Sequence, residues 1–278
     1  MSNISDITRL QEELRVVNNK LLNAEKVQSD FLSNIKNEIN NPLTSIMGLL
    51  KVVTQKPEDQ AENAEITKMI YREVHNLNFQ MRNILTAAEI EAGQASPNVS
   101  NFEVNELIHE VAQSFIDIEL AKKEDFGMKL SELGSFQTDK EKVAIILSNL
   151  LSNALKFNAA GRKVVIDTRG SDADKLVLVV QDFGVGINKA DLNTIFDRFR
   201  QLDSGTEKAF GGHGLGLSVV HALVSMLNGE FEVDSHEGEG TVFRIAIPSV
   251  ISDDSQSVFY DDDEGILFGT DEEAEETF

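Results

Sequence analysis

Two groups of residues in the second half of the chain have the types and spacing of a site for a phosphate-bearing ligand. Asn149, Asn153 and Lys156 recur at i, i+4 and i+7, so they share one face of a predicted helix. The segment 211–217, Gly-Gly-His-Gly-Leu-Gly-Leu, opens another predicted helix. Unpaired N–H groups and the helix dipole both favour a phosphate there. The alternative for the first group is an amphipathic helix whose amides face water.

Two further segments lie between these groups. The segment 181–187, Gln-Asp-Phe-Gly-Val-Gly-Ile, follows a predicted strand directly, and its glycines allow the backbone to approach a ligand. Taken alone it is also compatible with an ordinary strand-to-loop turn. The segment 195–200, Ile-Phe-Asp-Arg-Phe-Arg, fits core packing equally well. The glycine-rich segment lacks the glycine spacing of a dinucleotide-binding turn and the Gly-Lys-Ser/Thr of a P-loop.

A third region with potential chemistry lies near the N-terminus. Here Asn37 and Glu38 are followed by Asn41 and Pro42 within an apolar series that predicts a helix. The nitrogen of a carboxamide donates its lone pair to the carbonyl group. Asn37 is therefore not a useful nucleophile at neutral pH.

Taken together, these segments resemble the sensor histidine kinases. The four nucleotide segments have the family's order and spacing over about 70 residues, and the resemblance covers roughly residues 28–248. In the family a phosphorylated histidine directly precedes the glutamate that Glu38 matches. Here Asn37 occupies that place, either naturally or as an engineered replacement, whereas Asn41 and Pro42 match the family pattern.

The resemblance implies ATP and Mg²⁺ as cofactors. It implies that Asn153 coordinates the metal ion, that Lys156 contacts phosphate oxygens and that Asp182 accepts a hydrogen bond from the adenine amino group. The full set of implied nucleotide-binding residues is Asn149, Asn153, Lys156, Phe157, Asp182, Gly184, Gly186, Ile187, Arg200, Gly212, Gly214, Leu215, Gly216 and Leu217. Gyrase-type ATPases of the same fold have a glutamate base at the place of Asn149. Rapid ATP hydrolysis is therefore not expected here.

The resemblance leaves the activity open between two classes. In the enzymatic class, the chain has altered kinase chemistry or acts as a phosphatase toward a response regulator, with Glu38 and Asn41 as the catalytic residues. The family residue that matches Asn41 positions water against an aspartyl phosphate. The alternative for Asn41 is a polar cap before Pro42. In the non-enzymatic class, the chain is an ATP-gated scaffold, a pseudokinase that docks a receiver domain or pairs with a complete histidine kinase.

The elements that position these residues follow from the apolar periodicity. Residues 1–27 contain three heptads typical of a short coiled coil, with a lone amphipathic helix as the alternative. Residues 28–92 predict a helical hairpin that is too thin to bury its own apolar stripe. We therefore expect a homodimer with a four-helix bundle. After a linker at 93–101, residues 102–248 alternate helices with the strands of a mainly antiparallel sheet, which indicates an α+β sandwich. Residues 249–278 form an acidic tail that we expect to be disordered.

Composition excludes several functions. The chain has no cysteine, which rules out disulfides and thiol catalysis. Its net charge of −22 argues against a nucleic-acid partner, because neutralising phosphates requires a basic face. We find no apolar run of the roughly 20 residues that a membrane span needs, and no signal peptide. These features lead us to expect a cytoplasmic protein.

Overall fold

The computed structural model describes residues 14, 15, 18, 33, 35–37, 39–55, 60–117, 125–159, 161–192, 194–196 and 214–250. The predicted coiled coil and acidic tail lie almost entirely outside these residues. So do Glu38, Arg200 and Gly212 of the predicted site. No helix in the described part of the chain is long and apolar enough to cross a membrane.

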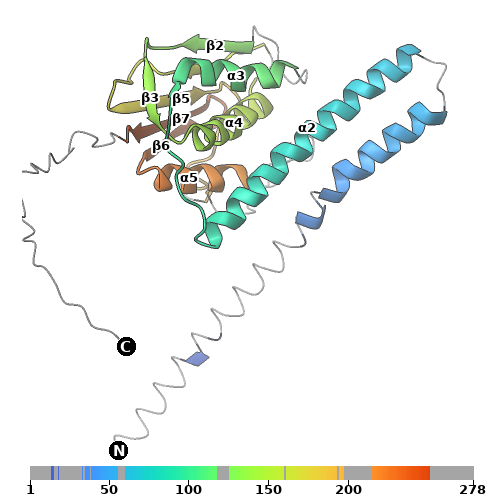
Figure 1. The fold of residues 1–278 in the computed structure, drawn as a ribbon, viewed down its shortest axis with the longest axis horizontal. Coiled ribbons are helices and arrows are strands. Elements are labelled where there is room, and N and C mark those ends of the chain that lie inside the picture. The colour runs from blue at the N-terminus through green and yellow to red at the C-terminus, as the bar shows by residue number, and fades with distance from the viewer. Residues whose placement is uncertain are drawn as a thin grey trace, which may run out of the picture.

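The N-terminal part is a helical hairpin. Residues 39–55 form its first helix, and α2 (Gln60–Glu91) is the second. Figure 1 shows the two helices running side by side, with the C-terminal part of α2 lying next to α5 of the C-terminal part. Several of their large apolar side chains are exposed in the single chain: Leu43, Met47, Leu50, Met69, Tyr71, Val74, Met81 and Leu85. Exposed apolar surface on this scale is typical of an interaction face.

The C-terminal part is a sandwich of one mainly antiparallel sheet and a layer of helices. Its five-stranded sheet has the order β2 (Phe126–Lys129), β4 (Val164–Asp167), β5 (Lys175–Gln181), β7 (Gly240–Pro248) and β6 (Glu230–His236). Only the β2–β4 pair is parallel. Three helices, α3 (Val104–Asp117), α4 (Lys140–Phe157) and α5 (Gly216–Met226), lie together on one side of this sheet (Figure 1). The predicted mainly antiparallel α+β sandwich is confirmed.

The core lies between this sheet and the helices. Four apolar residues of α4 are fully buried in this core: Ile146, Leu147, Leu150 and Leu151. Asp139 caps the N-terminus of α4 by accepting a hydrogen bond from the Lys142 backbone N–H at 2.9 Å. Burial alone would raise the pKa of the Asp139 carboxyl. Hydrogen bonds from Lys142 and Asn98, with the Lys142 charge, outweigh that effect and hold the pKa below its usual value.

Three short strands were not predicted from the sequence. β2 is one of them, and β1 (Ser100–Glu103) pairs antiparallel with β3 (Ser135–Thr138) in a separate sheet. β1 therefore begins inside the segment that we interpreted as a linker. The sequence pattern also predicts Asn105 as the N-terminal cap of the helix that follows the linker, and this prediction is wrong. Helix α3 already begins at Val104, and the Asn105 side chain donates a hydrogen bond to the Ser131 carbonyl oxygen at 2.9 Å instead.

Candidate nucleotide-binding site

Asp182 directly follows β5 and is held in place by backbone groups of two segments. Its side chain is buried, and one carboxylate oxygen, Oδ1, accepts hydrogen bonds from the N–H groups of Gly184 at 2.9 Å and Thr241 at 3.2 Å. Among the described residues, none donates a hydrogen bond to the other oxygen, Oδ2. Burial raises the pKa of the Asp182 carboxyl, and this effect outweighs the two backbone hydrogen bonds, which lower it. Asp182 thus presents one free acceptor oxygen.

The loop after Asp182 is fixed by residues from two other elements. Asn158, which follows α4, accepts a hydrogen bond from the Phe183 N–H at 2.9 Å through its Oδ1 atom. Ser235 of β6 accepts one from the Ile187 N–H at 2.8 Å through its hydroxyl oxygen. Neither residue was among the predicted site residues, because their roles depend on contacts across 25 and 48 positions. The loop therefore has a defined shape that does not rest on its own sequence alone.

Gly184 lies where the loop passes the C-terminal end of α4. A Cβ atom at this position would overlap the carbonyl oxygen of Phe157, which also accepts a hydrogen bond from the Val185 N–H. Only glycine permits this approach of two backbones. The strand-to-loop segment and the helix carrying Asn153 and Lys156 are held together at this point.

This contact gives a direct prediction. Replacing Gly184 by alanine should separate the loop from α4 and lower the free energy of unfolding by more than about 1 kcal/mol, as substitutions that the native backbone cannot accept do. Chemical denaturation measures this change. Gly134→Ala is the matched control, because a Cβ at Gly134 meets no atom within 4 Å. An equal effect of the two substitutions would contradict the prediction.

The predicted polar residues of α4 have different surroundings. Asn149 is 2% exposed, and its side chain is hydrogen-bonded to Asn83 of α2. Asn153, one turn later, is half-buried. The ammonium group of Lys156 lies 4.7 Å from the centre of the Phe157 ring. Asn153 and Lys156 therefore have accessible surface for a ligand, whereas Asn149 faces the hairpin.

The glycine-rich segment is described from Gly214 onward. Gly214 has a positive φ of 66°, and Gly216 is the first residue of α5. Leu215 is buried and accepts the first hydrogen bonds of the helix from Ser218 and Val219. The first residue of α5 lies beside Asn149, because a Cβ atom at Gly216 would be 2.7 Å from Asn149 Oδ1. Helices α4 and α5 lie on the same side of the sheet. Free N–H groups at such a position suit phosphate oxygens.

These residues fit ATP with Mg²⁺. The Asp182 oxygen that receives no hydrogen bond from the described residues is a suitable acceptor for an exocyclic amino group. The carboxamide oxygen of Asn153 is a hard ligand of the kind that Mg²⁺ accepts together with phosphate oxygens. The described residues contain no cluster of three or more His, Cys, Asp or Glu side chains able to hold a metal alone.

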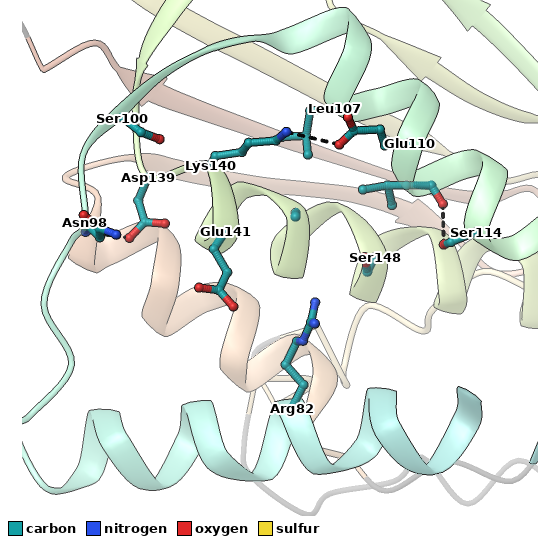
Figure 2. Close-up of a pocket in the computed structure, with 12 residues that line it drawn as sticks. Arg82, Asn98, Ser100, Leu107, Glu110, Ser114, Asp139, Lys140, Glu141 and Ser148 are labelled. Atoms are coloured by element: carbon teal, nitrogen blue, oxygen red, sulfur yellow. Dashed lines mark hydrogen bonds and ion pairs between the residues drawn. The ribbon is translucent and has the colours of Figure 1, made fainter. Parts of the chain in front are cut away.

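A cavity of about 470 Å³ lies elsewhere, between α2, α3 and the start of α4. Figure 2 shows Arg82 reaching into it from α2, with Lys140 and Glu110 forming an ion pair on the opposite wall. None of its lining residues is one of the predicted nucleotide-binding residues, although Ser148 directly precedes Asn149. The cavity lies between the hairpin and one side of the sandwich, and it is not part of the candidate site.

The positions near the N-terminus are partly described. Asn37 and Asn41 are helical and exposed, and Pro42 is buried. His75 on α2 is half-buried, with its ring centre 4.5 Å from that of Tyr71. The two asparagines are one helical turn apart, so they share an accessible face.

Comparisons with known families agree with these two parts of the chain. The model of the His Kinase A (phospho-acceptor) domain matches residues 27–93. The model described as histidine kinase-, DNA gyrase B-, and HSP90-like ATPase matches residues 138–251. The autoinducer 2 sensor kinase/phosphatase LuxQ of Vibrio vulnificus is 30% identical over 252 residues, and the sensor protein EvgS of Escherichia coli is 29% identical over 258. These alignments cover 87% and 90% of this chain but only 29% and 21% of the relatives.

Solved structures show the same fold. Histidine kinase AdeS of Acinetobacter baumannii aligns over 77% of this chain and 98% of its own, with a TM-score of 0.53 and 22% identity. Full-length ShkA in complex with AMPPNP aligns over 78% of this chain and 45% of its own, with a TM-score of 0.55 and 23% identity.

Proposed function

We propose that this chain, which belongs to the sensor histidine kinase family, binds ATP with Mg²⁺ and acts on the phosphorylated receiver domain of a response regulator without phosphorylating itself at residue 37. One observation carries the proposal. An accessible carboxamide stands at the acceptor position, and a second one, Asn41, follows one turn later on the same face. The chain spans less than a third of the length of these relatives, so the proposal is limited to the hairpin and the sandwich described above.

The nucleotide part of the proposal rests on the C-terminal sandwich. Asp182 would hold the adenine, Asn153 the metal ion, and Lys156 with the start of α5 the phosphates. When bound, ATP with Mg²⁺ supplies a transferable phosphoryl group. Calorimetric titration with ATP in the presence of Mg²⁺ tests this part, and a protein that binds no nucleotide would overturn it.

The phosphatase part rests on the hairpin. A carboxamide can accept a hydrogen bond from a water molecule and donate one to a phosphoryl oxygen, but it neither takes up nor releases a proton. Asn41 would therefore orient a water molecule for attack on the phosphorus of an aspartyl phosphate. The aspartate leaves as the carboxylate and inorganic phosphate is formed. One relative is named a sensor kinase/phosphatase, which supports this choice.

We expect Asn41→Ala to slow the dephosphorylation of a phosphorylated receiver domain by roughly tenfold to a hundredfold, because a misplaced water loses the benefit of orientation. The release of phosphate from the cognate regulator is the measurement. Asn40→Ala is the matched control, since Asn40 is also exposed but lies on a neighbouring face of the helix. If the parent binds nucleotide and regulator but does not accelerate dephosphorylation, the non-catalytic scaffold is the correct function.

The exposed apolar stripe of the hairpin supports a homodimer. Met47 is 71% exposed and Leu85 is 58% exposed in the single chain, and pairing two hairpins into a four-helix bundle would cover such side chains. The receiver domain would then dock on the outer face, where Asn37 and Asn41 lie.

A further inference from the structure

One hydrogen-bonded pair in this structure joins the helical hairpin directly to the helix that carries the nucleotide residues. The carboxamides of Asn83 in α2 and Asn149 in α4 are bonded to each other in both directions. Asn83 Nδ2 donates to Asn149 Oδ1 at 2.9 Å, and Asn149 Nδ2 donates to Asn83 Oδ1 at 2.8 Å. The side chain of Asn149 also donates to the Ile145 carbonyl oxygen at 2.9 Å.

The pair is deeply buried, which makes it sensitive to any relative movement of the two helices. Asn83 is 6% exposed and Asn149 is 2% exposed. A buried carboxamide that loses its partner keeps the full cost of desolvation, about 1–3 kcal/mol. The pair therefore favours one position of α2 on the sandwich over positions shifted by a fraction of a helical turn.

Asn149 passes this constraint to the start of α5. A Cβ atom at Gly216 would lie only 2.7 Å from Asn149 Oδ1, so the carboxamide rests directly against the Gly216 backbone. This oxygen is the one that accepts the hydrogen bond from Asn83. One continuous set of contacts thus runs from α2, through the side chain of Asn149, to the turn Gly214–Leu217.

The surroundings of the pair explain why the position of α2 on the sandwich depends on these two hydrogen bonds. Arg82 and Ser148 immediately precede Asn83 and Asn149, and both line the cavity between the hairpin and the sandwich (Figure 2). On that side α2 and α4 are separated by space instead of packed side chains. On the other side Ile84, Thr86 and Ala87 of α2 are buried, and α2 contacts α5. The amide pair lies at the boundary between these two regions, where a small rotation of α2 would open it.

We propose that Asn83, although it belongs to the hairpin, is a positioning residue for the phosphate-binding turn and couples the arrangement of the hairpin to nucleotide affinity. This inference rests on the proposed binding of ATP. It differs from that proposal because Asn83 would touch neither nucleotide nor metal. Coupling between binding sites is reciprocal, so the nucleotide should in turn stabilise the seating of α2.

The test compares a nucleotide with a nucleoside in the full chain. Asn83→Ala should weaken binding of the ATP analogue AMPPNP with Mg²⁺ at least fivefold. Binding of adenosine should change less than twofold, because adenosine reaches Asp182 but has no phosphate for the turn. Asn78→Ala is the matched control, since Asn78 is an exposed asparagine on the same helix, and it should change neither affinity more than twofold. Equal losses for the two ligands would indicate general loosening and would overturn the inference, as would unchanged binding of both.

A second measurement uses the unaltered protein and does not depend on how the variant folds. Addition of AMPPNP with Mg²⁺ should slow hydrogen exchange of the backbone amides at 83–87 as well as those at the start of α5. Protection at α5 alone would overturn the inference while leaving the proposed function intact. A parent protein that binds no AMPPNP would overturn the proposed function itself, and the inference with it.

Discussion

The substitution Asp182→Asn is expected to remove most of the affinity for ATP and to create a preference for inosine triphosphate. In the parent, both backbone donors, from Gly184 and Thr241, reach the same carboxylate oxygen, Oδ1. An asparagine must place its carbonyl oxygen there to satisfy them. Its amino group then stands where Oδ2 was, so the free acceptor becomes a donor.

This inversion decides which base can bind. In the proposed site, adenine presents its amino group to residue 182. The asparagine amide would be a second donor facing it, and both donors would remain unpaired in a buried setting. Hypoxanthine presents a carbonyl oxygen at the same place and can accept from the new amide. We expect the affinity of Asp182→Asn for ATP to fall more than tenfold, about 1.4 kcal/mol or more, and its affinity for inosine triphosphate to exceed that of the parent.

Calorimetry with both nucleotides against both proteins provides the measurement. Asp182→Ala is the informative control, because it removes the acceptor without adding a donor and should therefore lose ATP without gaining inosine triphosphate. An Asp182→Asn variant that binds ATP as well as the parent would show that this residue does not contact the base.

The same carboxyl group predicts the sign of the pH dependence. Burial raises its pKa above the ordinary 3.8, so protonation begins at a higher pH than for an exposed aspartate. A protonated carboxyl loses its free acceptor, and ATP affinity should fall as the pH is lowered through this raised value. For folding without ligand the sign is opposite. The neutral form is favoured by the fold, so this contribution to stability is present below pH 3.8 and is lost as the pH rises through the folded pKa.

Much of the fold was predictable because its signals are local. The helices α4 and α5 and the strands β4 to β7 follow from apolar periodicity. It predicts helices at 139–157 and 215–227 and strands at 163–169, 175–181, 230–235 and 241–247, all within a few residues of the observed bounds. The strands β1, β2 and β3 have four residues each and lack the run of β-branched residues, Val164, Val165 and Ile166, that marks the equally short β4. β2 contains Gly127, which weakens the strand signal, and β1 finds its partner about 35 residues away in β3.

The candidate site likewise contains residues that the sequence predicts and residues that only the structure identifies. Asp182 and Gly184 stand in a short segment whose glycines and strand end are visible in the sequence. The importance of Asn83 is not visible there, because its partner Asn149 is 66 positions away and nothing in the α2 sequence sets Asn83 apart from Asn76 or Asn78. The sequence predicted that Asn149 shares a face of α4 with Asn153, but only the folded structure shows that its side chain faces the hairpin.

Replacing Asn37 by histidine should switch autophosphorylation from absent to readily measurable. Asn37 is helical and exposed, so an imidazole at this position would be accessible to a bound nucleotide, and Glu38 follows it directly. In the reaction the bond between the terminal phosphorus and the bridging oxygen of ATP breaks, a nitrogen–phosphorus bond forms, ADP leaves and the imidazole proton is lost. A carboxamide offers no such nucleophile, so its replacement opens a reaction path instead of accelerating an existing one.

The measurement incubates the parent and Asn37→His with γ-labelled ATP and counts the acid-labile, base-stable label on each protein. The difference in label between the two proteins should be close to all-or-none. Asn37→Ala should remain unlabelled, and adding Asp182→Ala to the histidine variant should remove the label, because the phosphate must come from bound ATP. The parent retains one histidine in the described hairpin, His75, which is half-buried against Tyr71. Acid-labile label on the parent would contradict the prediction. A histidine other than one at residue 37 would then be the phosphoryl acceptor, and His75 on the second helix would be the residue to replace next.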